Sequence, residues 1–101
     1  MTPEGDITTA ILKWLNQQHG VWAIKIHAGG YQGRGVPDII GVWHGRMLAL
    51  EVKRPDGGII SNIQKHRVAK ILATGAIAGV VTSVSDTKAL ITKHTDERQS
   101  R

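Results

Sequence analysis

The segment from residue 46 to residue 84 most constrains the fold, because one helical pattern separates two strand-like runs. Residues 46–53 and 77–84 have the apolar character of strands, and Ser61 opens a helical pattern that ends near Gly75. Two strands joined through a helix are usually parallel neighbours in one sheet. Because residues 77–84 are almost wholly apolar, we expect that strand to be buried on both faces.

The remaining segments extend this sheet and add two helices. Ile7, Ile11, Trp14 and Leu15 have helical spacing, so residues 3–18 should form a helix capped by Thr2. The further expected elements are strands at 21–27 and 36–43, a glycine-rich loop at 28–35, a tight turn at 44–45 and a final helix capped by Ser85, from 86 to about 93.

The predicted fold class is therefore α/β, with a mixed sheet flanked by helices in the order α-β-β-β-α-β-α. The turn at His44-Gly45 should make the second and third strands antiparallel. The chain of 101 residues has the length of one domain, which we place at residues 1–93. Residues 94–101 are polar and should form a frayed tail.

Composition narrows the classes of function. The sequence has no Cys, so disulfides, Cys-ligated zinc and a thiol nucleophile are excluded. A net charge of +5 is compatible with a nucleic-acid partner, while an aromatic content of only 4% argues against RNA-type stacking platforms. The polar N-terminal residues and the lack of a long apolar run lead us to expect a cytoplasmic protein without a membrane partner.

Two acidic residues and a lysine fall together in the expected sheet. Side chains alternate along a strand, so Glu51 and Lys53 share one face with Ala49. Asp38 lies on the neighbouring antiparallel strand and can approach Glu51. Two adjacent carboxylates repel unless a proton or cation lies between them, and oxygen ligands favour Mg²⁺ or Mn²⁺. Lys53 would then orient or deprotonate the attacking water, or neutralise charge on a phosphate.

Each of these residues also has a plainer interpretation. Glu51 and Lys53 can form an ion pair on an exposed sheet surface, and Asp38 can be a turn residue after a proline. Glu4 extends the apolar stripe of the first helix, which places it toward the body of the protein, but an acid there also suits the helix dipole. Asp6 lies off that stripe, and the dipole interpretation suits it fully.

Gln64 occupies the first turn of the second helix, on its apolar stripe and near the end of the third strand. The run Ser61-Asn62-Ile63-Gln64 also matches the S-x-x-Q capping box, in which the glutamine side chain binds the N-cap backbone. The two roles are compatible with each other.

The ordered residues resemble a known nuclease signature. Gly35-Val36-Pro37-Asp38 followed by Leu50-Glu51-Val52-Lys53-Arg54-Pro55 is similar to the PD-(D/E)xK motif. Glu4 at the head of the first helix and Gln64 after the E-x-K run resemble the virus-type replication-repair nuclease (VRR-NUC) branch. The resemblance covers roughly residues 4–84, nearly the whole chain.

The resemblance implies a restriction-endonuclease-like fold and hydrolysis of phosphodiester bonds with Mg²⁺ or Mn²⁺. It implies that Asp38, Glu51 and the backbone carbonyl of Val52 bind the metal and that Lys53 is catalytic. Glu4 would complete the catalytic set directly or through water, and Gln64 would position a ligand or the substrate.

By the same resemblance the substrate would be branched DNA, such as a Holliday junction, cut by a homodimer during repair or recombination in a bacterial or phage-infected cell. A non-catalytic DNA-binding or assembly module with a nuclease fold, a flap nuclease and an RNA nuclease are the alternatives. Candidate DNA contacts are Tyr31 and Arg34 in the glycine-rich loop, Arg54 and Lys65. Each also has a plainer interpretation. Tyr31 and Arg34 can simply belong to a turn, Arg54 can pair with Asp56, and Lys65 can lie on a solvated helix face. Trp22 and Trp43 are candidate dimer contacts, although core packing suits them equally well.

Overall fold

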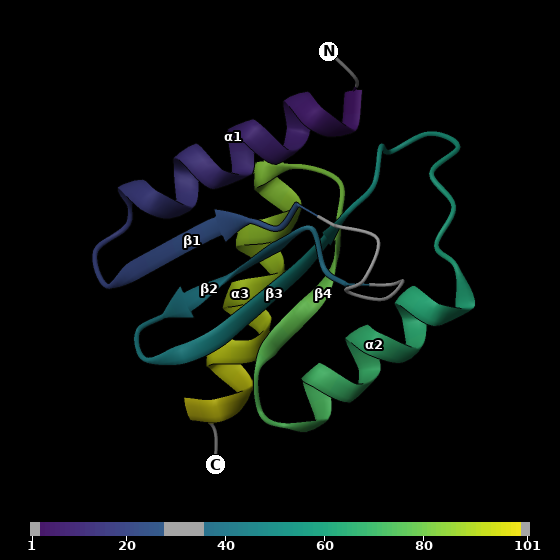
Figure 1. The fold of residues 1–101 in the computed structure, drawn as a ribbon. Helices are drawn as coiled ribbons and strands as arrows, with labels where there is room; N and C mark the ends of the chain where they lie inside the picture. The colour runs from purple at the N-terminus through teal and green to yellow at the C-terminus, as the bar shows by residue number, and fades with distance from the viewer. Residues whose placement is uncertain (1–2, 28–35, 100–101) are drawn as a thin grey trace.

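The computed structural model describes residues 3–27 and 36–99, which form a four-stranded sheet with three helices (Figure 1). The elements are α1 (Pro3–Gln17), β1 (Val21–Lys25), β2 (Ile39–Trp43), β3 (Arg46–Val52), α2 (Asn62–Ala73), β4 (Ile77–Val81) and α3 (Val84–Gln99). The predicted order α-β-β-β-α-β-α is confirmed. No helix in these ranges is both long and apolar enough to cross a membrane.

The strands lie in the order β1-β2-β3-β4, which makes β3 a central strand. β2 pairs antiparallel with β1 and β3, whereas β3 and β4 are parallel, as the crossover through α2 requires. His44 and Gly45 both have positive φ, at 50° and 81°, which is the backbone of a tight hairpin turn. The mixed sheet predicted from the sequence is therefore confirmed.

One face of the sheet carries the core. Leu48, Leu50 and Val52 alternate along β3 and are fully buried with Ile11 and Leu15 of α1. Ile91 of α3 joins the same cluster. The apolar stripe of α1 and the alternation of β3 thus meet on one side of the sheet, which is the face covered by α1 and α3.

The opposite face is covered only in part. α2 packs against β4 and β3 on this side, and its Gln64 reaches Glu51. Over β1, β2 and the start of β3, four apolar side chains remain exposed: Trp22, Ile24, Val42 and Met47. Trp22 pairs with Val42 and Val42 with Met47 across the strands, so these residues form one patch, here called the open sheet face. Because alternate residues share a face, this patch lies on the Glu51 side of the sheet.

The two candidate interface tryptophans have different environments. Trp22 is 58% exposed on the open sheet face. Trp43 packs against the core and stacks on Trp14, with ring centroids 6.0 Å apart. Trp43 is therefore half-buried against the core, and Trp22 is the more exposed of the two candidates for a partner contact.

Several boundaries differ from those expected. β2 begins at Ile39, after Pro37, because proline has no N–H to donate to the ladder. Ser83, not Ser85, caps α3: its Oγ accepts a hydrogen bond from the Asp86 N–H at 2.9 Å.

The last helix is longer than the sequence suggested. α3 continues to Gln99 instead of ending near Lys93, so residues 94–99 of the expected tail are helical. Arg46 donates to the carbonyls of Gly75 and His94 at 2.6 and 3.3 Å, which ties this end of α3 to β3. The expected cap Thr2 and the expected loop at 28–35, with Tyr31 and Arg34, lie outside the described residues.

Candidate active site

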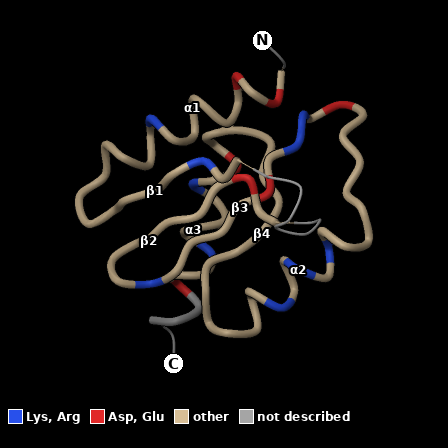
Figure 2. Tube along the Cα trace, viewed as in Figure 1, with Lys and Arg blue, Asp and Glu red and all other residues tan. Residues whose placement is uncertain are grey.

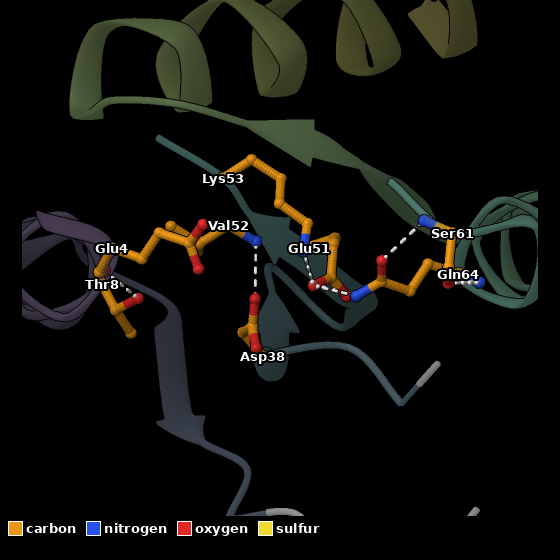
Figure 3. Close-up of polar contacts among 8 residues, drawn as sticks. All are labelled: Glu4, Thr8, Asp38, Glu51, Val52, Lys53, Ser61 and Gln64. Carbon is orange, nitrogen blue, oxygen red and sulfur yellow. Dashed lines mark hydrogen bonds and ion pairs between the residues drawn. The ribbon is translucent and has the colours of Figure 1, made fainter. Parts of the chain in front are cut away.

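The candidate site lies at the end of β3, between the first turns of α1 and α2 (Figure 3). Asp38 directly precedes β2, and its Oδ2 accepts a hydrogen bond from the backbone N–H of Val52 at 2.8 Å. The Asp38 carbonyl accepts a second hydrogen bond, from the N–H of Ile26 at 2.8 Å. Both neighbouring strands therefore hold Asp38. Since Ile39 pairs with Leu50, antiparallel register places Asp38 opposite Glu51, as the sequence predicted.

Glu51 is buried within the sheet. Its exposed fraction is 2%, so the exposed ion-pair interpretation of Glu51 and Lys53 is wrong. Its Oε1 accepts a hydrogen bond from Nε2 of Gln64 at 2.8 Å. Its Oε2 is buried without a hydrogen-bond partner among the described residues. A buried carboxylate oxygen without a partner is energetically costly, which is typical of a site that holds a proton or a cation.

The surroundings of Glu51 alter its acidity. The pKa of the Glu51 carboxyl is raised from 4.5 to about 8, chiefly because burial disfavours the charged form. The adjacent Asp38 carboxyl and its charge contribute to this rise, Lys53 opposes it, and the charge of Glu4 adds to it. Asp38 and Glu51 are thus close enough to share a proton, and the same closeness suits a shared cation.

Lys53 stands beside the buried acid. Its Nζ lies 3.8 Å from Oε1 of Glu51, and the side chain is 16% exposed. Its backbone N–H donates to the carbonyl of Val81 at 3.0 Å, which fixes Lys53 at the point where β3 leaves the sheet. The ammonium therefore lies between the buried carboxylate and solvent, where it can meet a phosphate or a water.

Gln64 combines the two roles that the sequence left open. Its backbone N–H donates to Oγ of Ser61 at 3.1 Å, and its Oε1 accepts from the N–H of Ser61 at 3.0 Å. These bonds complete the predicted capping box of α2. Nε2 of the same side chain donates to Glu51, so the cap residue is also a site residue.

Glu4 lies at the margin of the site. It is half-buried in the first turn of α1, and Figure 3 shows its carboxylate directed toward the end of β3. Asp6, the comparison residue, is exposed as expected. Within residues 3–27 and 36–99, no three acidic or histidine side chains gather closely enough to hold a metal ion. The structure therefore brings Asp38 and Glu51 together and leaves Glu4 as a more distant charge.

The described candidate DNA contacts lie on the surface around the site. Arg54 and Lys65 are exposed, and Arg54 donates to the carbonyl of Gly57 at 3.4 Å. Figure 2 shows basic residues along α2 and acidic residues where β3 ends and α1 begins. The first turn of α2 has no acidic residue, so its positive dipole end carries no opposing side-chain charge. A negative centre therefore lies beside a helix that carries basic side chains.

Two solved structures share this architecture. One, described as a VRR_NUC domain, is 24% identical with a TM-score of 0.73, and the match covers 91% of this chain and 97% of that one. A second, described as a VRR_NUC domain protein, is 18% identical with a TM-score of 0.65, covering 93% and 88%. Neither a family model nor a curated protein matches the sequence. The fold of this chain is therefore that of a VRR_NUC domain, as its ordered motif residues predicted.

Proposed function

We propose that this chain is a divalent-metal-dependent endonuclease that hydrolyses phosphodiester bonds in DNA. The observation that carries the proposal is the buried Oε2 of Glu51, which has no hydrogen-bond partner among the described residues and belongs to a carboxylate adjacent to that of Asp38. A cation between the two acids would offset both their repulsion and the missing partner.

The residues present fit Mg²⁺ or Mn²⁺. The donors would be the carboxylates of Asp38 and Glu51 and the backbone carbonyl of Val52, with Glu4 acting through a water. Mg²⁺ commonly binds through one or two carboxylates and keeps several waters, so the lack of a third close acid among the described residues agrees with this ion. When bound, such an ion polarises a phosphate and lowers the pKa of an attacking water.

The chain's own side chains would divide the remaining work. Lys53 would act in one of two ways: as an ammonium it would orient the attacking water and neutralise charge that develops on the phosphate, and as a neutral amine it would accept the proton of that water. Gln64 would keep the Glu51 carboxylate in one orientation through the bond to Oε1. Asp38 would be held for metal binding by the N–H of Val52, which occupies its Oδ2.

Surface charge supports a DNA substrate. Three of the eight acidic residues lie at or near the site, while 13 Lys and Arg residues belong to the chain as a whole. Arg54 and Lys65 would bind phosphates beside the site, together with Tyr31 and Arg34 of the segment before Asp38. On the family resemblance, the substrate would be branched DNA, such as a Holliday junction, processed in repair or recombination in a bacterial or phage-infected cell.

A homodimer would suit such a substrate, because two strands are cut in a coordinated way by two sites related by symmetry. The open sheet face supports this part of the proposal. Trp22, Ile24, Val42 and Met47 expose apolar surface that a second copy would cover.

The deciding experiment incubates the protein with labelled four-way junction, flap, duplex and single-stranded RNA, each with Mg²⁺, with Mn²⁺ and with chelator. We expect metal-dependent cleavage of the junction above the other substrates. If only the flap or only the RNA is cleaved, the proposed junction substrate is wrong and the cleaved molecule is the substrate. DNA binding without cleavage of any substrate, and without Mn²⁺ binding in calorimetry, would overturn the enzyme proposal in favour of a binding module.

A further inference from the structure

Three hydrogen bonds connect Ser61, Gln64 and Glu51 in series (Figure 3). Oγ of Ser61 accepts from the backbone N–H of Gln64 at 3.1 Å, and the N–H of Ser61 donates to Oε1 of Gln64 at 3.0 Å. Nε2 of Gln64 then donates to Oε1 of Glu51 at 2.8 Å. The two ends of one side-chain amide therefore contact the start of α2 and the buried carboxylate of β3.

The amide of Gln64 has a single favourable orientation in this position. A carboxamide has a donor end and an acceptor end, and its orientation follows from its hydrogen-bond partners. If the amide rotated by half a turn, its oxygen would face the Glu51 carboxylate. Its NH₂ group would then face the N–H of Ser61. The two N–H groups would repel each other whether Glu51 is charged or neutral, so the backbone of Ser61 determines which end of Gln64 meets Glu51.

This orientation also decides which oxygen of Glu51 is left over. Rotation of a carboxylate about its last bond is soft, so a fixed donor is needed to distinguish its two oxygens. Gln64 binds Oε1, and the Lys53 ammonium lies 3.8 Å from the same atom. Oε2 keeps no hydrogen-bond partner among the described residues. Gln64 thus directs one oxygen toward α2 and leaves the other for a different partner.

We propose that Ser61 is a positioning residue of the active site. Its backbone N–H orients the amide of Gln64, which holds Glu51 with Oε2 open to the cation. A helix cap alone needs only the bonds between Ser61 and Gln64 and makes no use of Nε2. The inference rests on the proposed function for its catalytic consequence, while the orientation of Gln64 can be measured independently of activity.

Two substitutions at Ser61 separate the N–H from the hydroxyl. Ser61 has φ −70°, which proline adopts without strain, and proline has no N–H. Ser61→Ala and Ser61→Pro both lose Oγ, but only Ser61→Pro loses the donor to Gln64. Thermal unfolding of the two variants checks that they fold equally well, and Ser61→Thr, which keeps both groups, serves as the rescue variant.

The first readout is the pair of Gln64 side-chain NH₂ signals in ¹⁵N–¹H NMR spectra of the metal-free protein, assigned by their loss in Gln64→Glu. In wild type, Ser61→Thr and Ser61→Ala we expect one proton of the pair to be shifted and protected from exchange by the carboxylate. In Ser61→Pro we expect the signals of a free glutamine. Unchanged Gln64 signals in Ser61→Pro would overturn the inference.

The second readout is Mn²⁺ affinity by calorimetry, followed by kcat and KM on the cleaved substrate. Relative to Ser61→Ala, we expect Ser61→Pro to bind Mn²⁺ roughly 10- to 100-fold more weakly, the usual effect of losing an outer-shell partner. The loss should appear in kcat more than in KM. Equal Mn²⁺ affinity in the two variants would overturn the proposed role. If wild type neither binds Mn²⁺ nor cleaves DNA, the proposed function fails, and the NMR spectra still decide the orientation of Gln64.

Discussion

Oδ2 of Asp38 accepts a hydrogen bond from the backbone N–H of Val52 over 2.8 Å. This bond joins the residue that precedes β2 to the last residue of β3, so it holds the Asp38 carboxylate beside Glu51, where the hairpin register has brought the two residues opposite each other. The two acids are 13 positions apart in the sequence and neighbours in the sheet. The pair, not either acid alone, is what a cation would recognise.

The charge of Asp38 can be removed without losing this bond. In Asp38→Asn the amide oxygen still accepts from Val52, so we expect the fold to be kept and cleavage to fall by roughly 100- to 1000-fold, in the range seen when a group that stabilises the transition state is removed. Rates of junction cleavage in saturating Mn²⁺ measure the effect, with unfolding temperature as the check on the fold. Asp56→Asn, in an exposed turn, is the matched control and should cleave like wild type. Equal rates for Asp38→Asn and Asp56→Asn would contradict the role of Asp38.

The raised pKa of Glu51 predicts how the stability of the metal-free protein depends on pH. The pKa is about 8 in the folded protein against 4.5 for an ordinary glutamate, so between these values the folded state holds a proton that the unfolded chain has lost. The stabilising contribution is complete below pH 4.5 and disappears as the pH rises through about 8. We therefore expect the unfolding temperature in chelator to decrease over this range.

Glu51→Gln provides the comparison, because a neutral amide cannot lose this proton. The variant should show a flatter pH profile and exceed the wild type in unfolding temperature above about pH 8. Mn²⁺ affinity of the wild type should increase over the same range, since the metal displaces the proton. A wild-type protein whose stability rises with pH relative to Glu51→Gln would contradict the raised pKa.

Glu4 and Asp6 offer a test within one helical turn. Both are acids in the first turn of α1, but Glu4 is half-buried toward the site and Asp6 is exposed. Loss of either charge should change helix stability by a similar, small amount, roughly 0.3–1 kcal/mol. We expect Glu4→Gln alone to weaken Mn²⁺ binding, by less than Asp38→Asn does, because Glu4 is the more distant acid. Calorimetric titration compares the three variants, and equal affinities for Glu4→Gln and Asp6→Asn would remove Glu4 from the site.

If the open sheet face is the dimer interface, a charged residue introduced there should prevent dimerisation. Trp22 of the edge strand β1 is the most exposed side chain of this face, and Trp22→Glu would place a charge in the contact. We expect light scattering at micromolar concentration to give a dimer for wild type and a monomer for Trp22→Glu. Ile59→Glu is the control, because Ile59 is 82% exposed and lies outside this face. A wild-type monomer, or a dimer that survives Trp22→Glu, would exclude this surface as the interface.

Local patterns in the sequence determined the architecture. Alternation along β3 placed Leu48, Leu50 and Val52 on one side and Glu51 on the other, because side chains in a strand have a period of two. The S-x-x-Q run predicted the start of α2, and His44-Gly45 predicted the hairpin that brings Asp38 opposite Glu51. Such features depend on residues a few positions apart, so they can be recognised in one sequence.

Only the tertiary structure decided which of these residues are buried. The sequence allowed Glu51 and Lys53 to be an exposed ion pair, whereas β3 lies inside the sheet with α2 above it and Glu51 is buried. It treated Trp22 and Trp43 alike, and stacking on Trp14 separates them. Burial, the orientation of the Gln64 amide and the distance of Glu4 all depend on packing between segments far apart in the chain, which short-range patterns do not encode.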